Sequence, residues 1–127
     1  MKNVMIVIIF LFLACQKDSK KQFEGPEKEW GAEEVIVPDS VSSMKIPLKI
    51  IFFASGCDIF KRMEVKETEN KTLNVIFFVY NPDYYNPAFS CPTSFFKRES
   101  EQIIEVNSKG SYTIVFNQGK LTKRVSV

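Results

Sequence analysis

Cysteine is the most reactive side chain in this sequence, and it occurs three times, at Cys15, Cys57 and Cys91. Histidine is absent, which removes the commonest general base, the commonest metal ligand and any Ser–His or Cys–His pair. The carboxylates are scattered through predicted turns and outward strand positions rather than paired for acid–base catalysis. The cysteines lack the CxxC spacing of a zinc site, and the isolated glycines form no phosphate-binding loop. We therefore expect a protein that is not an enzyme and holds no metal or other cofactor.

Cys15 closes an apolar run of eleven residues, Val4–Ala14, that follows the positively charged Lys2. A helix that crosses a bilayer needs about 20 apolar residues, so this run is too short for an anchor helix and matches the core of a signal peptide. The small Ala14 fits a cleavage site. The segment resembles a bacterial lipoprotein signal, and the resemblance implies that residues 1–14 are removed and that Cys15 carries a fatty acid. The alternative is an ordinary secretory signal in which the cysteine is incidental.

The residues that follow Cys15 are polar and charged, as expected of a tether. The triplet Gln-Lys-Asp at positions 16–18 resembles the surface-export signal of Bacteroidota lipoproteins. That resemblance implies a lipid-anchored protein of the outer membrane, exposed at the cell surface. Residues 15–32 contain few large apolar side chains, and we expect them to form a charged, flexible tether. Trp30 is expected to pack where the domain begins, the alternative being an exposed ring that stacks on a ligand.

Assigning Cys15 to a lipid leaves Cys57 and Cys91 as an even pair in an oxidising compartment. A disulfide between them closes a loop of 35 residues, counting both cysteines. Two free thiols, buried as small apolar side chains, are the alternative. We expect the disulfide, with the two Cα atoms within about 7 Å of each other.

The composition limits both the size of the domain and the class of partner. Removal of residues 1–14 leaves 113 of the 127 residues, a length typical of one domain. The 17 basic and 15 acidic residues nearly balance, and no clustered basic patch of the kind that binds nucleic acid is present. We therefore expect a single domain that does not bind nucleic acid.

From Glu33 to the end of the sequence the pattern is that of β-strands. Apolar and polar residues alternate, and turn signals recur every 8–12 residues or so without helical periodicity, which favours a β-sandwich. We predict an all-β, antiparallel sandwich of about seven strands over residues 33–127, with strands at 35–37, 44–54, 60–68, 73–80, 103–106, 112–116 and 121–127. Pro47 cannot donate a ladder hydrogen bond, so its strand is expected to lie at an edge or to contain a bulge. Residues 94–101 fit a strand or a helical turn, and we identify no internal repeat.

The region 44–127 resembles small Bacteroidota lipoproteins that carry an immunoglobulin-like domain. The residues that carry the resemblance are Gly56-Cys57, the hairpin Met63–Val79, Cys91 after a proline-containing loop, and Gly110–Phe116. The resemblance implies an immunoglobulin-like sandwich in which the Tyr112 hydroxyl fixes a corner of the chain. Trp30 precedes both domain cysteines, unlike the tryptophan of antibody domains, so we expect the disulfide to join strand ends or loops. The resemblance brings no known activity with it.

The stretch Tyr80–Phe89 is the one surface segment whose composition suggests recognition. Tyr84, Tyr85 and Phe89 stand among asparagine and aspartate, and glycan and peptide sites combine such flat apolar rings with polar groups. The alternative is that these rings fold back and cap the open end of the sandwich. If they contact a ligand, we expect Tyr84 and Tyr85 to be exposed.

These observations predict a non-catalytic envelope lipoprotein, a binding or structural module held in the membrane by its lipid, with a glycan or a protein as its expected ligand. The alternative is an accessory subunit of a larger outer-membrane complex. Strand 73–80 has apolar side chains on both faces, and one of these faces would meet the partner. Residues 39–41 also resemble the short O-glycosylation motif of Bacteroidota proteins, with Ser40 as the acceptor.

Overall fold

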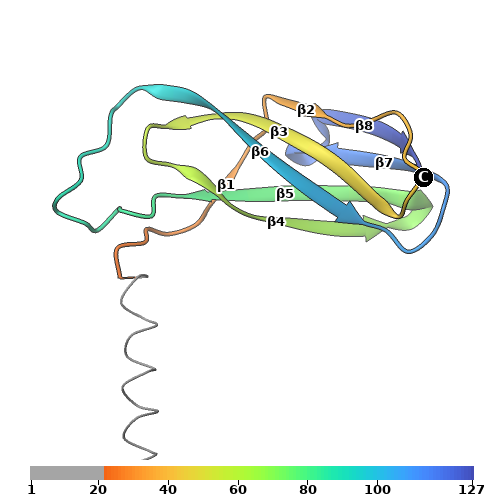
Figure 1. Ribbon diagram of the computed structural model, residues 1–127, viewed down its shortest axis with the longest axis horizontal. Coiled ribbons are helices and arrows are strands. Elements are labelled where there is room, and N and C mark those ends of the chain that lie inside the picture. Colours follow the sequence, from red (N-terminus) through yellow and green to blue (C-terminus); the bar gives the residue numbers. More distant parts are fainter. Residues whose placement is uncertain (1–21) are drawn as a thin grey trace, which may run out of the picture.

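The computed structural model describes residues 22–127, so the predicted signal peptide and Cys15 lie outside the described residues. Within the described residues the chain is all-β and forms two sheets that pack against each other as a sandwich (Figure 1). The strands there are β1 (Lys28–Trp30), β2 (Glu34–Ile36), β3 (Lys45–Ser55), β4 (Ile59–Thr68), β5 (Thr72–Tyr80), β6 (Phe95–Glu105), β7 (Ser111–Phe116) and β8 (Leu121–Ser126). Two short 3-10 turns, η1 (Glu69–Lys71) and η2 (Asn117–Gly119), connect β4 to β5 and β7 to β8.

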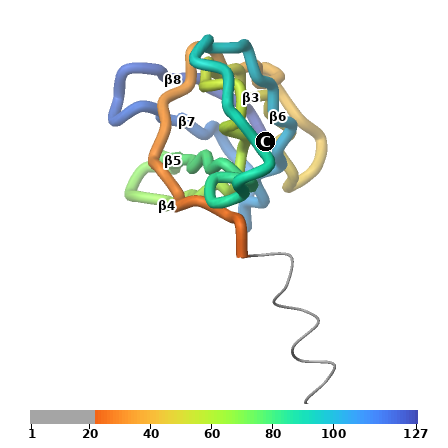
Figure 2. Tube along the Cα trace, turned by 90° about the vertical axis from the view of Figure 1, so that its left-hand side faces the viewer, coloured from red at the N-terminus to blue at the C-terminus, as the bar shows by residue number. Residues whose placement is uncertain are grey.

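The larger sheet is built around β5 and the smaller sheet around β3. β4 pairs with one edge of β5 along its length, whereas β1 and β7 share the other edge, opposite residues 77–79 and 72–74, and β8 follows β7. In the smaller sheet, β3 lies between the short β2 and the long β6. Figure 2 shows the two layers from one end of the molecule.

The prediction of an entirely antiparallel sandwich is wrong at one strand pair, because β5 and β7 are parallel. The order of the strands explains this pairing. After β5 the chain crosses to the smaller sheet, runs back along it as β6, and returns to the larger sheet as β7, now in the same direction as β5. Parallel neighbours require a crossover connection of this kind, whereas a tight hairpin produces antiparallel ones.

The core lies between β3 on one side and β5 and β7 on the other. The alternating apolar residues of β3 point inward, as the sequence predicts, and Phe52 packs against Phe77 of β5 with ring centroids 5.3 Å apart. The fully buried large side chains are Val35, Ile46, Ile50, Phe52, Leu73, Phe77, Val79, Tyr112, Ile114, Phe116 and Val125. Burial of this many large side chains, at about 1.5–3 kcal/mol each, is the main stabilising contribution to the fold.

Two strand predictions change in the structure. β6 spans Phe95–Glu105 as one strand, because the whole segment pairs with β3, from Ser55 opposite Phe95 to Lys45 opposite Glu105. β3 is therefore a central strand, not the edge strand that Pro47 suggests. Pro47 lies outside the pairing with β2, which covers only residues 49–51 of β3, so on that side the strand is locally an edge and tolerates a residue without an N–H.

The sequence predicts a tether up to residue 32, but the domain begins before that position. Lys28–Trp30 forms β1 and pairs with β5, and Trp30 packs against the core and donates from Nε1 to the Phe53 carbonyl (2.8 Å). Asn117 fixes the next segment, because its side chain accepts from the Ala32 N–H (2.8 Å) and donates to the Ala32 carbonyl (2.6 Å). The charges assigned to a solvated tether instead form ion pairs with the domain, namely Glu24–Lys61, Glu27–Arg62 and Lys28–Asp58.

The predicted corner at Tyr112 is present. The ring is fully buried, and the hydroxyl donates to the Ser108 carbonyl at 2.8 Å, four residues upstream. The hydroxyl oxygen also lies 3.0 Å from Ser108 Oγ. This contact holds the turn between β6 and β7 against the start of β7.

Candidate ligand-contact loop

Residues 81–94 connect β5 to β6 and project from one end of the sandwich (Figure 1). This loop contains the three predicted ligand-contact residues. Tyr84, Tyr85 and Phe89 are 58%, 62% and 60% exposed, so the rings do not fold back into the core. Tyr84 and Tyr85 lie edge to face, with centroids 4.8 Å apart and an interplanar angle of 86°. The loop therefore presents a paired tyrosine surface to its surroundings.

Further exposed aromatic residues, which no local sequence pattern indicates, lie at the same end of the sandwich as the loop. Three further exposed rings come from strand ends beside it: Phe53 near the end of β3, and Phe95 and Phe96 at the start of β6. We call these six residues the aromatic end: Phe53, Tyr84, Tyr85, Phe89, Phe95 and Phe96. Every exposed aromatic side chain of the described residues belongs to this set. An exposed apolar patch of this kind typically marks an interaction surface.

The predicted disulfide between Cys57 and Cys91 is present, with the Cα atoms 5.5 Å apart. It joins the loop to the turn between β3 and β4, so it links loops at one end of the sandwich. Close packing supports this junction, because a Cβ atom on Gly56 would lie 2.8 Å from Pro92 Cγ. Arg98 of β6 adds a hydrogen bond from Nη2 to the Gly56 carbonyl (2.7 Å). The far half of the loop is therefore held covalently and by packing.

Asn81 fixes the near half of the loop. Its buried side chain donates from Nδ2 to Cys91 Sγ (3.1 Å) and accepts at Oδ1 from the Asp83 N–H (2.8 Å). Its carbonyl accepts from the Gly25 N–H at 2.8 Å, and the Tyr85 N–H donates to the Phe23 carbonyl at 3.1 Å. The segment before β1 thus runs directly along the loop.

Gly25 is required at this contact because there is no space for a side chain. A Cβ atom built on Gly25 would lie 2.6 Å from Tyr84 Cβ and 3.2 Å from the Asn81 carbonyl oxygen. This close approach allows the Gly25 N–H to reach that carbonyl. A glycine that reads as a flexible tether residue in the sequence therefore packs against the loop.

A short tandem repeat spans the end of β5 and the first half of the loop, in contrast to the expectation of no internal repeat. Residues 80–84 read Tyr-Asn-Pro-Asp-Tyr and residues 85–89 read Tyr-Asn-Pro-Ala-Phe. In each copy the asparagine carbonyl accepts from the aromatic N–H three residues later, at 3.4 Å for Asn81 and 3.2 Å for Asn86. Each asparagine Oδ1 accepts from the N–H two residues later, at 2.8 and 3.0 Å. Proline after asparagine presets this turn, so each copy ends by presenting one aromatic ring.

The outer face of β5 is the surface that the alternative function requires. β5 is a central strand, because it pairs with β1, β4 and β7. Its outward apolar side chains are half-buried. Lys61 of β4 lies over the Tyr80 ring at 4.2 Å, and Arg62 lies over the Phe78 ring at 4.1 Å. Arg62 donates one hydrogen bond to Glu64 and another to Glu27. Both raise the pKa of Arg62 above its usual value, and the bond to Glu64 has the larger effect. This face therefore presents cations rather than open apolar rings.

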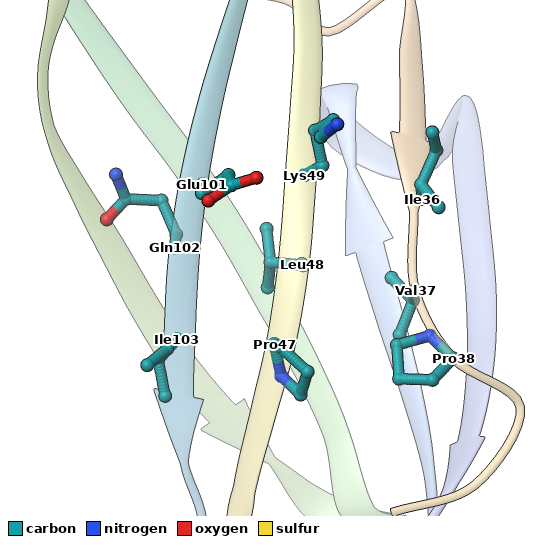
Figure 3. A pocket seen from close by; sticks show the side chains of 9 residues that line it. All are labelled: Ile36, Val37, Pro38, Pro47, Leu48, Lys49, Glu101, Gln102 and Ile103. Carbon is teal, nitrogen blue, oxygen red and sulfur yellow. The ribbon is translucent and has the colours of Figure 1, made fainter.

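An open hollow of about 730 Å³ on the outer face of the smaller sheet is a further surface feature (Figure 3). The hollow forms because the pairing of β2 with β3 ends at Ile36. Beyond that residue the chain lies against β8, where the Val41 N–H donates to the Ser126 carbonyl (2.8 Å). Its lining residues are Ile36, Val37, Pro38, Pro47, Leu48, Lys49, Glu101, Gln102 and Ile103. The lining is mainly apolar, with Lys49 and Glu101 as register partners on neighbouring strands.

Comparison of the chain with protein-family models, with curated proteins and with solved structures finds no match. Within residues 22–127 no helix is long and apolar enough to cross a membrane. Among the same residues, no three histidine, cysteine or acidic side chains form a group that could hold a metal ion. The function is therefore argued from the surfaces described above.

Proposed function

We propose that this chain is a non-catalytic, lipid-anchored module of the cell envelope that contacts its partner through the aromatic end. The gathering of every exposed aromatic side chain of the described residues at one end carries this proposal. The loop at its centre is held by the Cys57–Cys91 disulfide and by the Asn81 hydrogen bonds. A surface that is already ordered loses little conformational entropy on binding, so its rings are well suited to recognition.

We further propose that Cys15 carries the lipid and that the protein resides in the outer membrane. The supporting observation is the apolar run that ends at Ala14-Cys15, followed by a polar segment. An immunoglobulin-like identity for the sandwich is supported by the Tyr112 corner. The parallel pairing of β5 with β7 is a departure from the antiparallel sheets of that fold.

Metabolic labelling with a fatty-acid analogue tests the anchor. The wild-type chain should take up the label and sediment with membranes, and Cys15→Ala should remove the label and release or mislocalise the protein. The double variant Cys57→Ala/Cys91→Ala is the matched control, because it removes the other two cysteines and should keep the label. A wild-type chain that never takes up the label would refute the anchor.

Site-specific photocrosslinking tests the contact surface in intact envelopes. A photoreactive side chain in place of Tyr85 should form adducts with an envelope component. The same group in place of Met44, which is 37% exposed and directly precedes β3 at the opposite end, should form few. Equal adduct formation at the two positions would contradict a role for the aromatic end.

Removing the tyrosines tests whether they serve binding or folding. Tyr84→Ala/Tyr85→Ala should weaken partner contact while lowering the unfolding free energy by much less than the ~3–5 kcal/mol typical of one buried aromatic ring. The reason is that more than half of each side chain is already exposed. Urea unfolding measures the loss, and a loss of several kcal/mol would show that the pair is a structural plug.

The alternative function, an accessory subunit that meets a larger complex through the outer face of β5, has weaker support. Lys61 and Arg62 already lie over the rings of Tyr80 and Phe78, so less apolar area remains for a partner. Crosslinks from Ile76, at the centre of that face, that exceed those from position 85 would favour this alternative.

A further inference from the structure

We infer that the aromatic end rests on the lipid surface in which the chain is anchored, so that the partner of this end is the membrane interface itself. The inference deepens the proposed function and rests on the proposed lipidation of Cys15. Three features of the molecule carry it: the place where the chain enters the domain, the length of the segment that leads there, and the chemistry of the exposed rings.

The chain enters the domain at the aromatic end. The Tyr85 N–H donates to the Phe23 carbonyl (3.1 Å), and the Gly25 N–H donates to the Asn81 carbonyl (2.8 Å). The first described residues therefore lie directly against the tyrosine pair. An anchor that precedes these residues in the chain is therefore connected to this end of the sandwich.

The segment between the proposed anchor and the domain is short. Seven residue steps separate Cys15 from Gln22, and a fully extended chain of that length spans about 25 Å. β3 has 11 residues and runs along the sandwich, so its first and last Cα atoms, ten residue steps apart, are separated by about 33 Å at 3.3 Å per residue. An orientation with the opposite end on the membrane would hold Gln22 beyond the reach of the segment. The aromatic end must therefore face the bilayer or lie beside it.

The exposed rings suit a lipid interface. Phenylalanine side chains insert at the boundary between headgroups and acyl chains, and tyrosine places its ring there while its hydroxyl stays hydrated. Positions 16–21 contain three lysines and one aspartate, a positive balance that favours anionic headgroups. The loop projects outward from the sandwich (Figure 1). A projecting set of rings fits a flat surface better than a small ligand, which is usually enclosed in a concave site.

Depth-dependent quenching of tryptophan fluorescence tests the inference on the lipidated, full-length mature chain. The chain is reconstituted into vesicles of phosphatidylethanolamine and phosphatidylglycerol that contain a brominated lipid. Tyr85→Trp and Met44→Trp add a second tryptophan at the two ends, and the wild-type chain, with Trp30 alone, supplies the baseline. We expect the tryptophan at position 85 to be quenched and shifted to shorter wavelength, and the tryptophan at position 44 to remain at the level of the baseline. Phe89→Ser in the Tyr85→Trp chain should reduce the quenching.

A lipidated chain in which position 85 is quenched no more than position 44 would overturn the inference and leave the proposed anchor intact. Absence of a fatty acid on Cys15 would overturn both. A soluble envelope oligosaccharide that shifts the fluorescence at position 85 when no vesicles are present would assign this end to a glycan and overturn the lipid contact.

Discussion

The Cys57–Cys91 disulfide should contribute a large part of the stability of this domain, and its size can be estimated from the chain. The cysteines are separated by 34 positions in the sequence and are joined in the structure. In the chain-entropy model, removing a cross-link across about 35 residues lowers the unfolding free energy by about 4 kcal/mol. For a domain of this size that corresponds to a fall in Tm of roughly 15–20 °C.

The replacement residue matters, because the Cys91 sulfur also accepts a hydrogen bond from Asn81 Nδ2 (3.1 Å). Cys57→Ala/Cys91→Ser removes the cross-link but keeps an acceptor at position 91. Cys57→Ala/Cys91→Ala also leaves the buried Asn81 amide without that partner, which should cost about 1 kcal/mol more. The difference between the two variants isolates the hydrogen bond, and the Ala/Ser variant isolates the cross-link.

Urea unfolding followed by tryptophan fluorescence and by circular dichroism provides the measurement. The midpoint should fall in both variants, and wild-type protein treated with a reductant should unfold at the midpoint of the Ala/Ser variant. A loss below about 1 kcal/mol in the Ala/Ser variant would refute the estimate, because the chain-entropy model assigns several times that value to a loop of this length. Full titration of two thiols in the folded protein, without reductant, would refute the disulfide itself.

Two further predictions concern side chains that join distant segments. Asn117→Ala should lower the unfolding free energy by about 2–3 kcal/mol, because it removes both hydrogen bonds to Ala32 and places alanine at a left-handed residue with φ of 54°. Asn117→Gly should recover about 1 kcal/mol of that loss, and equal losses in thermal unfolding would contradict the backbone part of the argument. Tyr112→Phe should cost about 1 kcal/mol through loss of the hydrogen bond to the Ser108 carbonyl, and an unchanged Tm would show that the corner is held by packing alone.

Local pattern was enough to predict most strands of the domain. Alternation of apolar and polar residues over 44–54 identifies the inward face of β3, because side chains on a strand point alternately to its two faces. The charged segment 94–101 was ambiguous, because its charges lie on a solvated strand at the surface. Only the long partner strand, β3, stabilises it as part of β6.

The candidate site was predicted in part. Tyr84, Tyr85 and Phe89 are clustered in the sequence, so composition alone identifies their loop, and the repeated Tyr-Asn-Pro triplet could have revealed the two turns. Phe53, Phe95 and Phe96 gave no such signal, because exposure of a ring near a strand end depends on which segments pack beside it.

The sequence by itself determined the all-β class of the fold, the pair of cysteines available for a disulfide and the loop that carries the tyrosines. These properties follow from local periodicity, from the number of cysteines in the domain and from the residue types that favour turns. Each of these acts over a few residues or depends on residue type alone. Tertiary structure decided the parallel pairing of β5 with β7, the docking of residues 22–32 and the assembly of the aromatic end. Each of these joins segments that are far apart in the chain, and their contact energy depends on a geometry that exists only after the two sheets have packed together.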